Sequence, residues 1–237
     1  MQKLILMLIS AVAIGGCAQA PQLSPKGDAI FYALQADTMM NTWRYECGQV
    51  SSRANYLAES ARTDWWRRNG SLVEAADFGL AYNMVTVTDT RQDTGARLAM
   101  ALTWEVQERA NALVDKKLSN ADDKDALCNK ILSDYRQGNW DIKGSEEIQA
   151  ALQSMKKASV EQRDDYDLKR GRIEAKTKKS YGRSLYVVEQ FAEQEGCEKS
   201  SVQLIKGEWP YEIYDVVCDA KPFMLMRCEW GRCATME

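Results

Sequence analysis

Histidine is absent from the 237 residues of this chain. Its absence excludes Ser-His-Asp and Cys-His catalysis, histidine-ligated zinc and histidine-based pH switching, because each of these needs an imidazole. The sequence also lacks the G-x-x-x-x-G-K-S/T loop and the G-x-G-x-x-G turn that bind the phosphates of nucleotides. We therefore expect no nucleotide and no cofactor, and the enzyme class that stays open is one that uses only carboxylates.

An excess of positive charge is also lacking. The chain carries 31 Lys and Arg against 34 Asp and Glu, and the first number falls from 31 to 30 if Lys3 is removed with an N-terminal signal. A protein dedicated to nucleic acid would be expected to present a basic surface. The mildly acidic balance therefore argues against nucleic acid as a partner.

The first residues, MQKLILMLISAVAIGGCAQAP, combine one positive charge at Lys3 with an apolar run from Leu4 to Ile14. The run is too short to span a bilayer comfortably and has the layout of a secretory signal. Because Gly15 and Gly16 directly precede Cys17, the segment resembles the lipobox of bacterial lipoproteins. The resemblance covers this N-terminal segment alone.

This resemblance implies a signal peptide over residues 1–16, a diacylglycerol on the thiol of Cys17 and a mature chain that begins there. Ala18 stands where the family's inner-membrane retention signal would be aspartate, which implies an outer-membrane protein facing the periplasm. Several acyl chains, at about 0.8 kcal/mol per buried methylene, would anchor it stably. Two alternatives stay open: an ordinary signal cleaved after Ala18 or Ala20, and an N-terminal helix buried in a core.

Proline is scarce as well, and its distribution divides the chain. The four prolines are Pro21, Pro25, Pro210 and Pro222, so proline interrupts no helix between the second and the third of them. Residues 17–27 show no apolar periodicity and are interpreted as a lipidated tether. Residues 28–143 carry apolar side chains at helical spacing. They predict four helices with short links, which form a helical bundle.

Two boundaries inside this bundle can be predicted from local signals. The apolar stripe of the first helix continues in phase through Gly48, so we expect that glycine to interrupt nothing. Asn69 and Gly70 form a C-cap pair, followed by a capping box, and predict the end of the first helix and the start of the second. Residues 144–181 are predicted to form a charged connecting helix, with a basic patch for phosphates or anionic lipid as the alternative.

Residues 182–237 predict a second, compact module. They begin with a short helical face and continue with three β-rich runs, SVQLIKGE, YEIYDVVCD and PFMLMRCEW, separated by turn sequences. This order indicates a helix packed on a small antiparallel sheet that ends in a hairpin. The predicted fold class is therefore α+β and mainly α, with an N-terminal helical bundle followed by a C-terminal helix and antiparallel sheet.

Six cysteines follow the lipobox: Cys47, Cys128, Cys197, Cys218, Cys228 and Cys233. An even number in an exported chain indicates disulfides. If each domain is self-contained, Cys47 pairs with Cys128. The other four allow three pairings, and we favour Cys197 with Cys218 and Cys228 with Cys233. The alternative is a zinc site built from these four, but their spacings lack the paired knuckles of common zinc modules, and an oxidising compartment removes the thiolates.

Two functions are compatible with these features. We favour a non-enzymatic binding or accessory module of the cell envelope, with an envelope protein as its partner. Trp209 and Trp230 lie in predicted turns and are the candidate contacts, although turn tryptophans can equally fold back onto a sheet. The alternative is a cell-wall glycan hydrolase with a carboxylate pair, in which Asp64 would be flanked by the rings of Trp65 and Trp66. Helical spacing instead favours Trp65 as a core residue.

Overall fold

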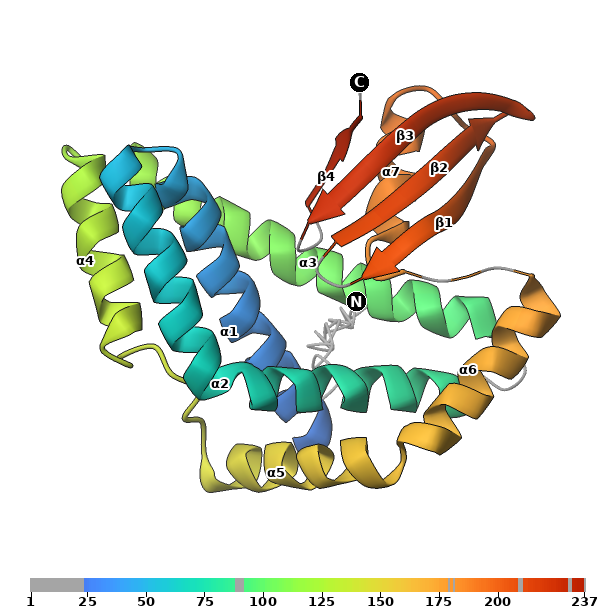
Figure 1. The fold of residues 1–237 in the computed structure, drawn as a ribbon, viewed down its shortest axis with the longest axis horizontal. Helices are drawn as coiled ribbons and strands as arrows, with labels where there is room; N and C mark the ends of the chain where they lie inside the picture. Colours follow the sequence, from blue (N-terminus) through green and yellow to red (C-terminus); the bar gives the residue numbers. More distant parts are fainter. Residues whose placement is uncertain are drawn as a thin grey trace, which may run out of the picture.

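The structure is a computed structural model, and it describes residues 24–87, 92–178, 180, 182–208, 211–229 and 232–236. Figure 1 shows a group of long helices and, beside it, a small sheet with one short helix behind it. The fold class is the predicted one, because the described chain is mainly helical and ends in a four-stranded antiparallel sheet. The helices are α1 (Pro25–Gly48), α2 (Ser52–Val87), α3 (Gln92–Ser119), α4 (Lys124–Arg136), α5 (Glu146–Glu161), α6 (Arg163–Thr177) and α7 (Leu185–Gln194).

The turn between α1 and α2 differs from the prediction. α1 ends at Gly48, and the N–H of Gln49 bonds back to two carbonyls of the last turn. The hydroxyl of Ser51 then accepts a hydrogen bond from the N–H of Ala54 at 3.1 Å and caps the start of α2. The prediction that Gly48 interrupts nothing is therefore wrong. The apolar stripe stays in phase across the turn because both helices bury side chains in the same core.

The predicted helix end at Asn69 and Gly70 is also wrong, because α2 continues through both residues. The amide of Asn69 bonds across to another segment: its Nδ2 donates to Asp141 at 2.8 Å and its Oδ1 accepts from the N–H of Ile142 at 2.8 Å. At Gly70 a Cβ would come within 2.7 Å of the indole of Trp66. Asn69 therefore serves tertiary packing, Gly70 leaves room for a ring of its own helix, and the middle of α2 bends sharply instead of breaking (Figure 1).

The larger core lies among the helices and includes α5. Its buried side chains include Met40, Trp65, Val114, Leu132, Leu152 and Met155. The last two belong to α5, so this helix packs in the bundle, and the connector predicted for residues 144–181 is reduced to α6. α6 is largely exposed and pairs charges along its own surface, as in the bonds from Lys169 to Asp165 and from Arg170 to Glu174. It has the character of a solvated connecting helix.

The strands are β1 (Ser200–Glu208), β2 (Tyr211–Cys218), β3 (Lys221–Glu229) and β4 (Arg232–Thr235). They pair in chain order as an antiparallel meander. The turn from β2 to β3 is made by Asp219 and Ala220, both at positive φ (48° and 62°), which is the conformation that a two-residue hairpin turn requires. The register shifts once between β1 and β2 and once between β2 and β3, so the sheet is locally irregular.

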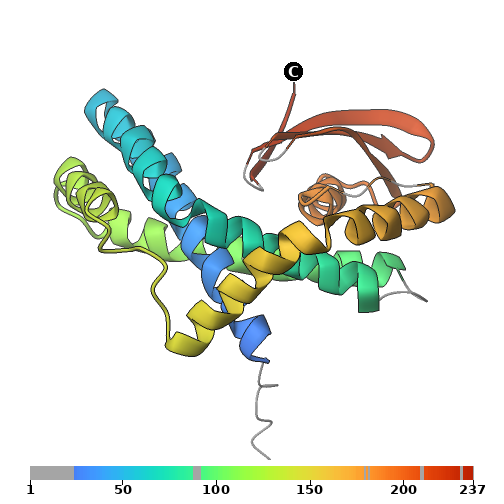
Figure 2. The same ribbon diagram turned by 60° about the horizontal axis from the view of Figure 1, so that its bottom comes forward.

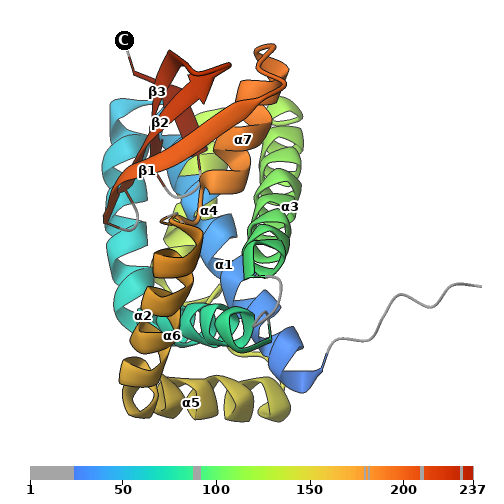
Figure 3. The same cartoon turned by 90° about the vertical axis from the view of Figure 1, so that its right-hand side faces the viewer.

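One face of the sheet is covered by α7. The second core joins buried side chains of α7 to buried side chains of β2 and β3, namely Leu185, Val188, Ala192, Tyr214, Val216 and Met226. Figures 2 and 3 show α7 between the sheet and α3. The ring of Trp104 on α3 meets that of Tyr186 on α7 at 5.8 Å between centroids. α7 is thus the layer that attaches the sheet to the long helices.

Three cysteine pairs lie at disulfide distance, in the favoured pairing of Cys47 with Cys128, Cys197 with Cys218, and Cys228 with Cys233. The first joins α1 to α4, the second joins the end of α7 to the end of β2, and the third bridges β3 and β4. Across the described ranges, no group of three or more His, Cys, Asp or Glu side chains is placed to hold a metal ion.

Candidate binding surface

The sheet has one face toward α7 and one toward solvent. Along β2, Glu212, Tyr214 and Val216 are buried, whereas Tyr211 is exposed and Asp215 is half-buried. Successive side chains of a strand point to opposite sides, so this alternation separates the two faces. The outer face is made of Gln203 and Lys206 on β1, Tyr211, Ile213, Asp215 and Val217 on β2, Phe223, Leu225, Arg227 and Glu229 on β3, Arg232 and Ala234 on β4, and Met236 just after it. In Figure 2 this face is the upper surface of the sheet, opposite α7.

Large apolar side chains are exposed on the outer face. Tyr211 is 47% exposed, Phe223 41%, Leu225 44% and Met236 44%. Leu225 and Met236 are direct neighbours, since the N–H of Met236 donates to the carbonyl of Leu225 at 2.8 Å. A single exposed leucine is ordinary on a protein surface, but apolar side chains gathered on one face mark an interaction site.

Two opposite charges, Asp215 and Arg227, lie in the middle of this apolar face, and Lys206 of β1 stands beside them, paired with Ile213. Asp215 is paired across the strands with Leu225, and Arg227 is paired with Ile213. The guanidinium of Arg227 lies 5.7 Å from the centre of the Tyr211 ring. Within the part of the chain that the structure describes, neither Asp215 nor Arg227 carries an ion pair. Both charges are therefore available to a partner.

A buried carboxylate holds the other side of the sheet in place. Glu212 accepts hydrogen bonds from the N–H groups of Arg183 (2.8 Å) and Ser184 (2.9 Å) and from the hydroxyl of Tyr214 (2.9 Å). It thereby caps α7, which makes no capping bond of its own at Ser184. Burial, with the added charge of Glu212, raises the pKa of Tyr214 far above its ordinary value. Gly182 allows this packing, because a Cβ there would lie 2.1 Å from the Tyr214 hydroxyl.

The end of the sheet near the long helices is fixed by charged contacts. Arg232 on β4 donates to Glu46 on α1 at 3.0 Å and to Asn111 on α3 at 2.7 Å. Arg44 on α1 lies 3.7 Å from Glu229 on β3. Together with α7, these contacts set the orientation of the outer face relative to the helices.

The residues that the sequence singled out for attachment and contact lie outside the described residues. These are Cys17, Trp209 and Trp230. Their described neighbours Tyr211 and Glu229 pair with each other at one end of the sheet. The sequence reasoning did not identify the outer face itself. The sequence does indicate this face, because Tyr211, Ile213 and Asp215 alternate along β2 with buried residues.

Of the two rings proposed to flank the acid of a glycan hydrolase, Trp66 is half-buried and Trp65 is inaccessible. The carboxylate of Asp64 lies 3.2 Å from Nε of Arg136 and 3.5 Å from Nη1 of Arg67. Trp65 is fully buried, and its indole N–H donates to the carbonyl of Trp140 at 2.9 Å. Trp65 is therefore a core residue, as its helical spacing predicted, and it is not accessible to a sugar.

A separate hollow of about 570 Å³ lies where the start of α1 meets the start of α5. Its lining includes the carboxylates of Asp28 and Glu147 and the rings of Phe31 and Tyr32. Two acids and aromatic rings are the residue types that a carboxylate-pair hydrolase uses. If the chain has such an activity, this hollow suits it better than Asp64.

Comparisons with models of known protein families, with curated proteins and with solved structures find no match for this chain. Along the described segments, none of the helices combines the length and the apolar character needed to cross a bilayer. The geometry of the chain itself is therefore the guide to its function.

Proposed function

We propose that the protein is a non-enzymatic binding or accessory module of the cell envelope that acts through the outer face of its sheet. The observation that supports this function is the exposure of Tyr211, Phe223, Leu225 and Met236 on one face. Aromatic residues and arginine are enriched at protein interfaces, and this face also offers Arg227. The two cysteine pairs of the sheet, Cys197 with Cys218 and Cys228 with Cys233, and the Glu212 contacts make it a rigid surface, which lowers the entropy cost of binding.

The proposed location is the outer membrane, with the chain facing the periplasm and anchored by lipid on Cys17. The support for this location is the N-terminal sequence, which resembles a lipobox. The tether was predicted to extend to residue 27, but α1 begins at Pro25, so the predicted C-terminal bound is wrong. Residues 17–23 can reach at most about 25 Å, so the start of α1 would lie close to the bilayer. The partner is an envelope protein, and neither nucleic acid nor nucleotide is required.

Replacing Cys17 by alanine should release the protein from membranes. The expected result is loss of labelled palmitate from the chain and its appearance in the soluble fraction, because the acyl chains supply the membrane affinity. Cell fractionation after metabolic labelling measures both. A C17A chain that stays with the membranes, together with a wild-type chain that incorporates no palmitate, would contradict the anchor.

Substituting the outer face should remove partner binding without unfolding the chain. We expect Phe223→Thr with Leu225→Thr to reduce envelope proteins recovered with the tagged chain by about tenfold or more, because central apolar anchors dominate binding energy. The matched control is Val160→Thr with Leu168→Gln, which removes exposed apolar side chains from α5 and α6. Equal recovery with both double variants would count against the outer face.

The hollow between α1 and α5 supports the second candidate, a cell-wall glycan hydrolase. Asp28→Asn and Glu147→Gln test it by assay on purified peptidoglycan. Cleavage by the wild-type chain that disappears in both variants would favour the hydrolase over the binding module. Absence of cleavage by the wild-type chain would leave the binding module as the better account.

A further inference from the structure

The outer face carries its charges in an arrangement that suits a second copy of the same chain. Ile213 lies opposite Arg227, and Asp215 lies opposite Leu225, so these four residues occupy the corners of a rectangle. The opposite charges stand on one diagonal, and the apolar side chains stand on the other. A surface that must complement itself needs both signs of charge at positions that a rotation can exchange.

We propose that two copies of this chain pack face to face through their outer faces, about a two-fold axis that passes over Ile213 and Leu225. Rotation about this axis brings Asp215 of each copy onto Arg227 of the other. Ile213 and Leu225 then meet their own counterparts. This proposal rests on the proposed function, because it takes the outer face to be a binding surface. It adds that a second copy of the chain binds there.

The geometry of the sheet is compatible with this axis. Adjacent strands lie about 4.8 Å apart and alternate residues about 6.8 Å apart, so an axis along the Ile213–Leu225 diagonal makes the strands of the two sheets cross at about 70°. This angle is close to the orthogonal mode in which sheets pack face to face. α7 already covers the inner face, so a second sheet can pack only on the outer one.

Charge and area together indicate how strong the contact would be. Asp215 is half-buried, and within the described residues neither Asp215 nor Arg227 carries an ion pair, so the second copy supplies what each lacks. The face measures roughly 19 Å across the four strands and about 27 Å along β2. This footprint is smaller than the ~800 Å² per partner of stable complexes. The pair should therefore be reversible and dependent on concentration.

The test exchanges the two charges between copies. The full-length chain, purified in detergent with a fluorescent label, is titrated with unlabelled chain through the micromolar range and followed by sedimentation velocity. We expect the wild-type chain to self-associate. Asp215→Arg alone and Arg227→Asp alone should each weaken self-association by about tenfold or more, because like charges would face each other twice. Labelled D215R mixed with unlabelled R227D should associate again, since both contacts then join opposite charges.

Three outcomes would overturn the proposal: a monomeric wild-type chain, single variants that associate as the wild type does, or no recovery in the mixture of D215R and R227D. Circular dichroism of each variant separates lost association from lost fold. A chain that carries both D215R and R227D is the control for folding and pairing, since its copies again bring opposite charges together. A monomeric wild-type chain whose F223T/L225T variant still loses its envelope partner would refute self-pairing alone. The proposed function would then stand.

Discussion

Replacing Arg62 by methionine should lower the free energy of unfolding at neutral pH by about 3–5 kcal/mol. Arg62 on α2 and Asp37 on α1 form an ion pair of 3.4 Å with side chains only 9% and 10% exposed. The Nε of Arg62 also donates to Asn41 at 2.7 Å, and its guanidinium lies 4.2 Å from the centre of a Trp66 ring. Removing this cation leaves the buried carboxyl with the charge of Arg183 alone, so it must keep a poorly compensated charge or bind a proton, and either costs free energy.

Urea denaturation at pH 7 measures this effect, and two control variants make it specific. Arg109→Met, from an exposed pair with Glu105, should change the free energy of unfolding by less than about 1 kcal/mol. Asp37→Leu with Arg62→Met removes both charges and should be far less destabilising than Arg62→Met alone. A double variant that is as unstable as the single one would show that packing of the arginine, not its charge, is what matters.

The same pair gives the expected pH dependence. Burial raises the pKa of Asp37 from 3.8 to about 6, although the charges of Arg62 and Arg183 act in the opposite direction. Because the folded state binds this proton more tightly than the unfolded state, the stability from Asp37 is full below pH 4 and is lost as pH rises through 6. The loss amounts to about 3 kcal/mol. Asp37→Asn should remove this slope, and parallel pH curves for the two proteins would contradict the assignment.

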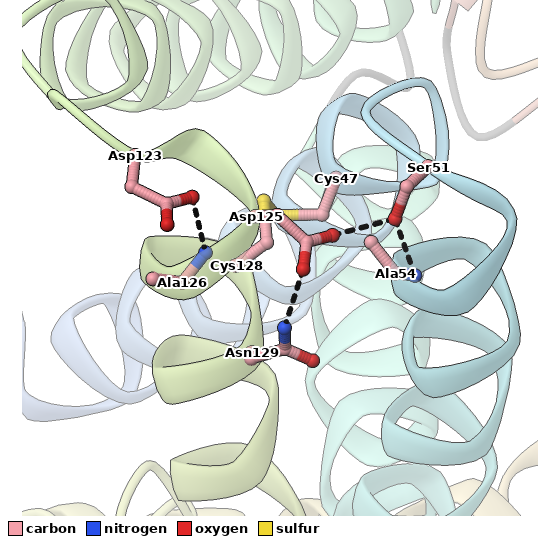
Figure 4. The surroundings of a disulfide bond; sticks show 8 residues. All are labelled: Cys47, Ser51, Ala54, Asp123, Asp125, Ala126, Cys128 and Asn129. Atoms are coloured by element: carbon pink, nitrogen blue, oxygen red, sulfur yellow. Dashed lines mark hydrogen bonds between the residues drawn. A yellow bond between two sulfur atoms is a disulfide. The ribbon is translucent and has the colours of Figure 1, made fainter.

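Replacing Cys47 and Cys128 by alanine should lower the free energy of unfolding by about 4 kcal/mol, because the bond closes a loop with a sequence separation of 81. The bond also lies beside other contacts at the start of α4, one of which reaches the start of α2 (Figure 4). Ser51 donates to Asp125 at 2.5 Å, and Asn129 donates to the other oxygen of Asp125 at 2.9 Å. Loss of the cross-link would therefore loosen a whole corner of the bundle.

The bond between Cys228 and Cys233 is the matched control, because its sequence separation is only 5. Alanine at both of these positions should cost about 2 kcal/mol by the same loop argument. Guanidinium denaturation without reductant compares the two double variants. A larger loss at the short loop, or free thiols at these positions in the native protein, would be inconsistent with the assigned cross-links.

Patterns of fixed period made the module order and the strands predictable from the sequence. The alternation in YEIYDVVCD belongs to one strand, and the cysteine positions favoured the pairing that the structure contains. Local breaker signals were less reliable. Asn69 and Gly70 look like a helix end, yet the amide of Asn69 bonds to Asp141 and Ile142, which are more than seventy residues away in the chain. Such tertiary use has no local signature.

The buried charges were missed for a related reason. A carboxylate is ordinarily placed in solvent, so Asp37 and Glu212 carried no expectation of burial. Their places in the sequence pattern did indicate burial. Asp37 falls on the apolar stripe that includes Ala33 and Met40, and Glu212 lies on the same side of its strand as Tyr214. A charged residue at a core position of a clear periodic pattern predicts a buried partner, here Arg62 for the first and the start of α7 for the second.

Site-specific photo-crosslinking in intact cells tests the central claim most directly. A photoreactive residue at position 225 on the outer face is compared with one at position 56, where Tyr56 is 78% exposed on α2. We expect discrete higher-mass adducts from position 225, including one of twice the chain's mass, and none from position 56. Equal labelling at the two positions, or no adduct from position 225, would contradict a binding role for the outer face.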